Sequence, residues 1–539
     1  MGKFIQITNN KKNGEEKVAD TKKEQERDEL HRAIWAIADD LRGSVDGWDF
    51  KSYILGFMFY RYISENLTNK INKDEWDAGD NGFDYSKLSD EDAEVARDDM
   101  VQTKGFFILP SELFCNVRAR AKSDENLNMT LEAVFNHIEE SAKGSESEDD
   151  FAGLFDDIDV NSNKLGATVA KRNDKLVKLL DGIGEMKLGD FQENTIDAFG
   201  DAYEYLMGMY ASNAGKSGGE YYTPQEVSEL LTKLAVAGKT EINKVYDPAC
   251  GSGSLLLKAA KILGKDNVRQ GFFGQEINLT TYNLCRINMF LHDIPFDKFD
   301  IANEDTLVSP QHWDDEPFEA IVSNPPYSIK WEGDDNPILI NDPRFSPAGV
   351  LAPKSKADMA FIMHSLSWLA TNGTAAIVCF PGIMYRGGAE KKIRQYLIDN
   401  NFVDTIIQLP SNLFFGTSIA TCIMVLKKSK SENKTLFIDA TNECVKVTNN
   451  NKLTDDNIQK IVDTFVAKEE KVEYFSRFVP NSEIADQDYN LSVSTYVEPE
   501  DTREKIDIKV LNAEIKEIVA REQVLRDEID KIIAEIEGE

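Results

Sequence analysis

Cysteine and histidine are scarce in this 539-residue chain, and neither is spaced as a metal site or a disulfide framework requires. The six cysteines include no C-x-x-C pair, and the five histidines do not cluster with them. Zinc sites and disulfide-rich secreted domains need such regular spacings. The composition therefore predicts no metal centre and reduced thiols, as in a cytoplasmic protein.

Long apolar runs are also absent. The longest, "YILGFMFYRYI" at residues 53–63, is well short of the about 20 residues that a membrane-spanning helix needs. The N-terminus is polar and charged, unlike a secretory signal. We therefore expect a soluble, cytoplasmic protein without a membrane partner.

Basic residues are outnumbered, with 61 Lys and Arg against 94 Asp and Glu and a net charge of −33. Nucleic-acid-binding proteins usually present a basic surface, so this balance speaks against extensive nucleic-acid contact. Net charge does not exclude a local basic groove or a basic partner protein.

The length predicts two or three domains. Residues 1–24 are polar without periodicity and are predicted to be a disordered leader. From Leu30 apolar residues recur every three or four positions, which predicts a helical N-terminal domain over residues 25–170. A further helix, with Phe199, Tyr203 and Leu206 on one face, leads into "AGKSGGEYYTP".

Short β-rich runs alternate with helical patterns over residues 171–480, which predicts an α/β domain with a doubly wound, mostly parallel sheet. The expected strands are residues 243–247, 271–277, 318–324, 374–380, 403–409, 419–426 and 435–440. The expected helices are residues 254–263, 279–291, 359–369 and 389–398. Ligands of such sheets bind at the carboxyl ends of the strands.

The C-terminal region, residues 481–539, ends in a heptad pattern over residues 508–536. Apolar residues alternate at spacings of three and four, with Glu522 as the one polar residue in the stripe. This pattern predicts a partner-docking coiled-coil helix. A helix that packs on its own domain is an equally good interpretation.

The stretch "VYDPACGSGSLLL" is typical of a strand, a glycine turn and a helix start. Gly251 and Gly253 allow close approach of a ligand, and Ser252 or Ser254 could cap the helix. The G-x-G-x-x-G dinucleotide fingerprint and the lysine of a phosphate loop are missing, which argues against hydride transfer. Asp247 at the strand end suits a cationic or hydroxylated ligand.

Two further acidic residues follow later strands. Glu276, in "GQEIN", could hold both ribose hydroxyls of an adenosine cofactor. Asp305, in "NEDTL", could accept the exocyclic amine of an adenine. One such residue alone would more often be an ordinary loop residue, but three at successive strand ends after a glycine turn favour a cofactor site.

The stretch "SNPPYS" ends another strand. Proline lacks an N–H group, so the backbone here offers acceptors without competing donors. The Asn324 side-chain oxygen and the Pro325 carbonyl could together hold both hydrogens of an NH₂ group, while Tyr327 offers a ring for stacking. An isolated N-P-P would be read as a rigid loop, but its place beside a cofactor site predicts amine activation.

"DPACGSG", "QEIN", "NEDTL" and "NPPY", in this order, resemble the S-adenosylmethionine-dependent amino-methyltransferases. "GGEYYTP" upstream matches the γ arrangement of DNA adenine-N6 methyltransferases. The N-terminal "HRAIWAIADDLRGSVDGWDFKSYILG", "KSKADMAFIMHSL", "FPGIMYRGGAEKKIRQYL" and "LPSNLFFGTSIATCIMVLKK" resemble the modification subunit of type I restriction-modification systems, closest to its IC branch. The resemblance covers nearly the whole chain after the leader.

The resemblance implies a catalytic loop and a cofactor site. The catalytic loop would comprise Asn324, Pro325, Pro326 and Tyr327, with Phe415 as a second ring that stacks on a flipped adenine. S-adenosylmethionine would be held by Glu220, Tyr221, Tyr222, Thr223, Pro224, Gln225, Asp247, Gly251, Ser252, Gly253, Ser254, Glu276 and Asp305. Cys250 stands where alanine is common in the family, and we expect no functional effect.

The resemblance also implies partners. The chain would methylate adenine N6 in double-stranded DNA in the prokaryotic cytoplasm, with two such subunits on one DNA specificity subunit and a restriction/translocase subunit in the full complex. Local phosphate contacts could come from Lys354, Lys356, Lys391, Lys392 and Arg394, although a solvated face is expected for any single lysine. Two alternatives remain open, a protein glutamine-N5 methyltransferase and a non-catalytic scaffold that retains the fold.

Overall fold

The computed structural model describes residues 26–37, 39, 49–188, 198–213, 223–414, 417–447, 450–500 and 508–538. The predicted leader, Glu220, Tyr221, Tyr222 and Phe415 lie outside these residues. The chain divides into two units, Met1–Val497 and Glu498–Glu539.

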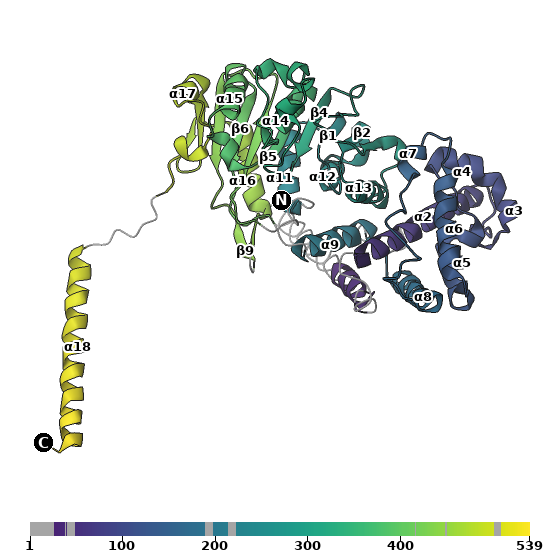
Figure 1. The fold of residues 1–539 in the computed structure, drawn as a ribbon, viewed down its shortest axis with the longest axis horizontal. Coiled ribbons are helices and arrows are strands. Elements are labelled where there is room, and N and C mark those ends of the chain that lie inside the picture. The colour runs from purple at the N-terminus through teal and green to yellow at the C-terminus, as the bar shows by residue number, and fades with distance from the viewer. Residues whose placement is uncertain are drawn as a thin grey trace, which may run out of the picture. The chain divides into compact units, whose positions relative to one another are not determined.

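The first part of the large unit is helical. Residues 26–37 form a helix, and α2, the longest helix of this part, packs against α5, α8 and α9 (Figure 1). Its rings pack against those of α6 and the loop after α7. Phe57 lies edge-on to Phe135 and Phe59 packs on Phe155, while Phe135 and Phe155 stack with ring centroids 4.5 Å apart. The helices are α2 (Asp49–Asp77), α3 (Asp90–Ala93), α4 (Arg97–Lys104), α5 (Phe114–Arg120), α6 (Leu127–Ser141), α7 (Glu148–Phe151), α8 (Val169–Glu185) and α9 (Ala198–Asn213).

A ten-stranded sheet forms the second part, in the order β11-β12-β8-β6-β7-β5-β4-β1-β2-β3. Strands β3, β2, β1, β4 and β5 are mutually parallel, and β7 is antiparallel to both β5 and β6. The strands of this sheet are β1 (Ile242–Asp247), β2 (Val268–Gln275), β3 (Phe299–Ala302), β4 (Phe318–Ser323), β5 (Leu369–Cys379), β6 (Val403–Gln408), β7 (Cys422–Leu426), β8 (Lys434–Asp439), β11 (Lys471–Val472) and β12 (Ser476–Pro480).

Helices cover both faces of the sheet, so the predicted doubly wound architecture is confirmed. Neighbouring strand residues point into two different cores, with Val245 in one and Tyr246 in the other, as the two-residue period of a strand requires. The covering helices are α11 (Gln225–Ala235), α12 (Ser254–Leu263), α13 (Leu279–Leu291), α14 (Asp358–Trp368), α15 (Ala389–Asp399), α16 (Asp455–Ala467) and α17 (Asn481–Asp486).

The two parts of the large unit are joined through α13. The ring of Phe59 on α2 lies 5.8 Å from that of Phe290 on α13. The buried guanidinium of Arg286 donates to the backbone carbonyls of Asp149 and Ala152, at 2.7 and 3.1 Å. The helical part therefore supports a helix that starts three residues after Glu276.

A separate hairpin and the C-terminal helix complete the described residues. The hairpin pairs β9 (Val445–Val447) with β10 (Asn450–Lys452) and makes a two-stranded sheet of its own. The second unit contains α18 (Ile508–Glu537), whose length agrees with the predicted heptad helix and which has no buried residue. Among the described residues, no helix is both long and apolar enough to cross a membrane.

Candidate active site

The ends of β1, β2 and β4 bring the predicted cofactor and target residues to one edge of the sheet. Tyr246 of β1 pairs with Ile321 of β4, and Asp247 pairs with Gly274 of β2. Strand order reverses between β1 and β4, which is the place where doubly wound sheets bind ligands. Asp247, Glu276 and Asn324 therefore lie at adjacent strand ends.

Asp247 is completely buried. One carboxylate oxygen, Oδ1, accepts the Ala249 N–H at 3.0 Å, while Oδ2 has no hydrogen-bond partner among the described residues. Burial raises the pKa of this carboxyl to about 7, and the neighbouring Glu276 adds to the rise. A buried carboxylate with an unpartnered oxygen is suited to a cationic ligand group, which would favour the ionised form.

The glycine turn after β1 has the backbone that only glycine adopts easily. Gly251 and Gly253 have φ of 54° and 79°. A Cβ on Gly253 would also lie 2.8 Å from the sulfur of Cys285 on α13. The predicted serine cap is wrong, because Gly253 is the N-cap of α12, no side chain caps the helix, and Ser254 is its first residue.

Glu276 ties this turn to the end of β2. Its Oε2 accepts the Gly251 N–H at 3.1 Å and its Oε1 accepts the Asn278 N–H at 2.9 Å. Burial raises the pKa of the Glu276 carboxyl. Asp305, half-buried in the loop after β3, accepts the Leu307 N–H at 2.9 Å. Each carboxylate oxygen can still accept a second donor.

Asn324 has a fixed amide orientation. Its Nδ2 donates to the hydroxyl of Thr223 at 3.0 Å, and its Oδ1 accepts the Tyr327 hydroxyl at 2.6 Å. Thr223 was expected among the cofactor residues, and its contact with Asn324 was not predicted. Desolvation raises the pKa of Tyr327 well above its ordinary value, so its hydroxyl remains a donor.

The Asn324–Tyr327 loop is held from two sides. The Tyr327 ring lies edge-on to that of Phe414, with centroids 6.5 Å apart. Ser328, at a φ of 53°, donates its N–H to both oxygens of Asp358, at 3.2 and 3.1 Å. Asp358 is buried at the start of α14 and was missed by sequence reasoning, since its only signal was its place within "KSKADMAF".

The remaining predicted cofactor residues near this edge open α11. Pro224 is buried and is the N-cap of α11, and Gln225 is its first residue. The side-chain oxygen and nitrogen of Gln225 are buried without a hydrogen-bond partner among the described residues. Ser252 is buried, and its carbonyl accepts Asn288 Nδ2 from α13 at 2.7 Å.

Comparison with known proteins gives the family. The N-6 DNA Methylase family matches residues 194–505, and the HsdM N-terminal domain matches residues 30–183. The chain is 49% identical over 532 residues to the type I restriction enzyme MpnII methylase subunit of Mycoplasma pneumoniae, covering 96% of this chain and 97% of that protein. The chain belongs to the methylase subunits of type I restriction enzymes.

Solved structures agree with this family. The type I restriction-modification methyltransferase subunit from Streptococcus thermophilus is 36% identical, with a TM-score of 0.77 over 88% of this chain and 100% of that one. A structure from a study of type I complex assembly has the same fold at 18% identity, with a TM-score of 0.63 over 95% of this chain and 99% of that one.

This methylase subunit is therefore an adenine-N6 DNA methyltransferase that uses S-adenosylmethionine as methyl donor. The described residues fit that cofactor, because a buried carboxylate, a glycine turn and a second carboxylate meet at the strand ends. The buried carboxylate can bind an ammonium group, the glycine turn can bind a carboxylate that comes close to the backbone, and the second carboxylate can bind ribose hydroxyls.

Three of the predicted phosphate-binding residues have other partners in the subunit. Lys391 pairs with Asp488. Arg394 is buried and donates to the carbonyls of Tyr489 and Ile383, and burial lowers its pKa to about 10. Its prediction as a phosphate contact is wrong, because it cannot reach DNA from inside the fold. Lys354 pairs with Asp335 at 3.0 Å.

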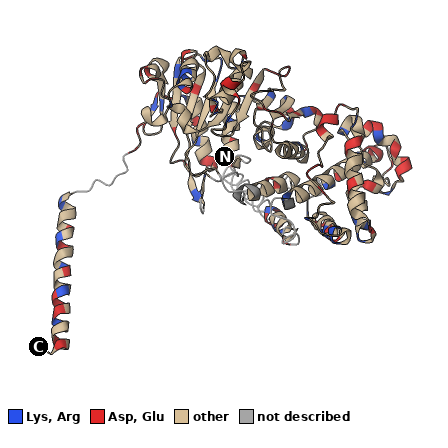
Figure 2. Ribbon diagram, in the orientation of Figure 1, with Lys and Arg blue, Asp and Glu red and all other residues tan. Residues whose placement is uncertain are grey.

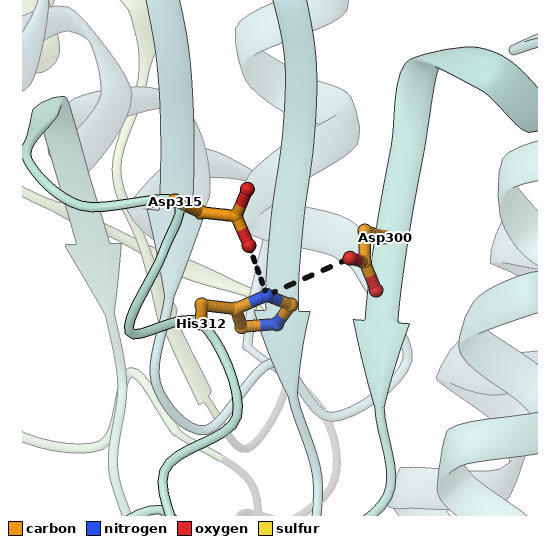
Figure 3. A group of neighbouring side chains, drawn as sticks. All are labelled: Asp300, His312 and Asp315. Atoms are coloured by element: carbon orange, nitrogen blue, oxygen red, sulfur yellow. Dashed lines mark hydrogen bonds and ion pairs between the residues drawn. The ribbon is translucent and has the colours of Figure 1, made fainter.

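One histidine between two aspartates lies on the same half of the sheet (Figure 3). His312 Nδ1 is 3.2 Å from an oxygen of Asp315 and 3.8 Å from one of Asp300, and Nε2 is 2.9 Å from the Gly274 carbonyl. Both ring nitrogens thus have partners. These contacts give the cluster a structural role, because they hold the loop after β3 against β2.

Proposed function

We propose that the subunit binds a flipped adenine at Asn324–Tyr327 with the cofactor held against Asp247, Gly251–Gly253 and Glu276. The observation that supports this most strongly is the orientation of Asn324 by Thr223 and Tyr327. Thr223 engages the amide nitrogen and the Tyr327 hydroxyl engages one lone pair of Oδ1, so the other lone pair of Oδ1 can accept an N–H of an incoming amine.

The chemistry at this loop is activation of an exocyclic NH₂. S-adenosylmethionine supplies an electrophilic methyl group on a sulfonium. Asn324 Oδ1 and the Pro325 carbonyl accept one N–H each, which aligns the nitrogen lone pair for attack on the methyl carbon. The new N–C bond replaces the S–C bond, and one N6 proton passes to solvent. Pro326 contributes no N–H that could compete for the acceptors.

The target base would be stacked between rings. Taking an adenine out of the duplex costs a few kcal/mol, which stacking and hydrogen bonds in a pocket can offset. Tyr327 is the described ring nearest the amide, and Phe414 lies edge-on to it. We keep Phe415, the next residue, as the second stacking ring.

Other predicted contacts complete the cofactor site. Asp247 would receive the ammonium of the methionine part, Glu276 the ribose hydroxyls and Asp305 the adenine amine. The methionine end of the cofactor and the turn would also be contacted by Glu220, Tyr221, Tyr222, Pro224, Gln225, Ser252 and Ser254.

We further propose that α18 docks on the helices of a DNA specificity subunit, with two methylase subunits on each specificity subunit. Its stripe residues are exposed, from Leu511 at 42% to Ile536 at 79%. None of this stripe is covered within its own unit, which favours the partner-docking interpretation of the heptad. Double-stranded DNA and a restriction subunit complete the proposed assembly.

We propose different boundaries for the helical domain and the C-terminal region. Packing of α8 on α2, α5 and α6 favours ending the helical domain after Glu185 rather than at residue 170. Packing of α17 on α15 and β12 favours assigning Asn481–Asp486 to the catalytic domain.

The test is methyl transfer from labelled S-adenosylmethionine to unmodified DNA, with and without the specificity subunit. We expect label on adenine N6 with both subunits, abolished by Asn324→Ala without loss of cofactor binding. Label on a protein instead would favour the glutamine-N5 methyltransferase. Cofactor binding with no label under any condition would favour the scaffold.

A further inference from the structure

The β9–β10 hairpin lies beside the loop that borders the proposed adenine pocket. The backbone N–H of Asn451 donates to the Asn412 carbonyl at 2.9 Å, and its side-chain Nδ2 donates to the Ser411 carbonyl at 2.8 Å. Two residues after Asn412 comes Phe414, whose ring contacts Tyr327. The hairpin is therefore one short loop away from the catalytic tyrosine.

This hairpin is exposed and basic in an acidic protein. It stands clear of the ten-stranded sheet (Figure 1), and Figure 2 marks its lysines in blue. Its described strand residues are lysines, valines and asparagines. Residues 445–447 and 450–452 contain two lysines and no acidic residue, whereas the whole chain has a net charge of −33. Lys446 and Lys452 are both exposed.

The register places the two lysines on opposite faces. Lys446 is paired with Asn451, so it shares the face that contacts the Ser411–Asn412 loop. Lys452 is paired with Val445 and lies near Glu226 at the start of α11. Val445 and Val447, on that second face, are 44% and 48% exposed.

The acidic residues near the hairpin do not neutralise the positive charge of both lysines equally. Glu443 pairs with Lys460 and accepts Asn457 Nδ2 at 3.0 Å, so it is already engaged. Asp455 and Asp456 lie in the first turn of α16, where the helix N-terminus favours negative charge.

We propose that the β9–β10 hairpin contacts the phosphodiester backbone of the DNA duplex next to the flipped adenine, with Lys446 and Lys452 as phosphate ligands. This proposal rests on the proposed function, since only a DNA substrate would present phosphates here. Each lysine that neutralises a phosphate releases a condensed counterion, so its contribution is visible in the salt dependence of binding.

The experiment measures DNA binding by the complex of the full chain with its specificity subunit, over a range of salt concentrations. The probe is a fluorescent duplex carrying the site that sequencing of N6-methyladenine defines. We expect Lys446→Ala and Lys452→Ala each to reduce the slope of log K against log salt by about one, and the double variant by about two.

Two controls separate charge from structure. Lys446→Arg keeps the charge and should retain the wild-type slope. Lys471→Ala, at an exposed position of the edge strand β11, should leave both slope and methyl transfer unchanged. An unchanged slope in Lys446→Ala and Lys452→Ala, or an equal loss in Lys446→Arg, would reject the hairpin contact.

The failure of this proposal is distinct from failure of the proposed function. If the wild-type complex methylates DNA and the lysine variants keep its salt slope, only the hairpin contact is wrong. If the wild-type complex neither binds nor methylates DNA, the proposed function and the hairpin contact are both rejected.

Discussion

Helices α2 and α18 are nearly equal in length, with 29 and 30 residues, yet they differ completely in burial. In α2 every residue from Tyr53 to Phe59 is buried. In α18 no residue is buried. A helix that is apolar on all sides must be covered by its own domain, whereas a single apolar stripe can be covered by one partner helix.

The largest expected effect is on folding through α2. Phe57→Ala should lower the free energy of unfolding by about 3–5 kcal/mol, because it removes a buried ring that packs edge-on to Phe135. Denaturant titration of the purified subunit measures this. Leu525→Ala on α18 is the matched control and should change the value by less than about 0.5 kcal/mol. Equal losses would break the contrast between the helices.

The affinity for the specificity subunit should depend on the stripe of α18, whereas the free energy of unfolding should not. Leu525→Glu places a charge in the stripe of α18 and should weaken binding to the specificity subunit by about 2–4 kcal/mol, without changing unfolding. Calorimetry or co-purification measures the affinity. Val524→Glu, equally exposed but outside the stripe, should have little effect. Full-strength binding by the Leu525→Glu variant would contradict the docking proposal.

Substitutions of site residues should change neither the free energy of unfolding nor the affinity for the specificity subunit. Their effect should therefore differ from those of the α2 and α18 variants. Thr223→Val removes the acceptor that orients the Asn324 amide, and kcat should fall by a factor of about 5–150, corresponding to about 1–3 kcal/mol for a buried hydrogen bond. Thr223→Ser should restore most of kcat. If cofactor affinity falls instead while kcat is kept, Thr223 is a cofactor contact rather than a positioning residue.

The smallest expected effect is a pH dependence. The raised pKa of Asp247, about 7, means that the carboxyl is protonated below this pH and ionised above it. A cationic cofactor group prefers the ionised form, so affinity should fall up to about tenfold for each pH unit below 7 and level off above it. Isothermal titration between pH 5.5 and 8.5 would be the measurement, with Asp247→Asn expected to flatten the profile.

Local sequence patterns were sufficient to predict many of the helices and strands. Residues 254–263 and 279–291 are helices with the predicted bounds, because their apolar periodicity and flanking turns are both strong. Short strands escaped prediction. Strand β3 has only four residues, and β11 has two, so neither holds enough alternation to stand out from a loop.

Errors occurred where a side chain has a choice of partners. Arg394 was predicted as a phosphate contact, but its guanidinium is buried and donates to the carbonyls of Tyr489 and Ile383. The serine cap of α12 failed because Gly253 occupies the cap position in a left-handed conformation. Neither choice is visible from spacing alone.

The sequence by itself determined the class of the protein, the order of its strand-end motifs and the heptad of its last helix. These depend on residue types at short spacings, where periodicity and turn chemistry act locally. Only the tertiary structure decided that Thr223 orients Asn324, that Asp358 holds the backbone of Ser328 and that the β9–β10 hairpin rests on the Ser411–Asn412 loop. Those contacts join residues 30 to 101 positions apart, which only the packing of the folded chain can bring together.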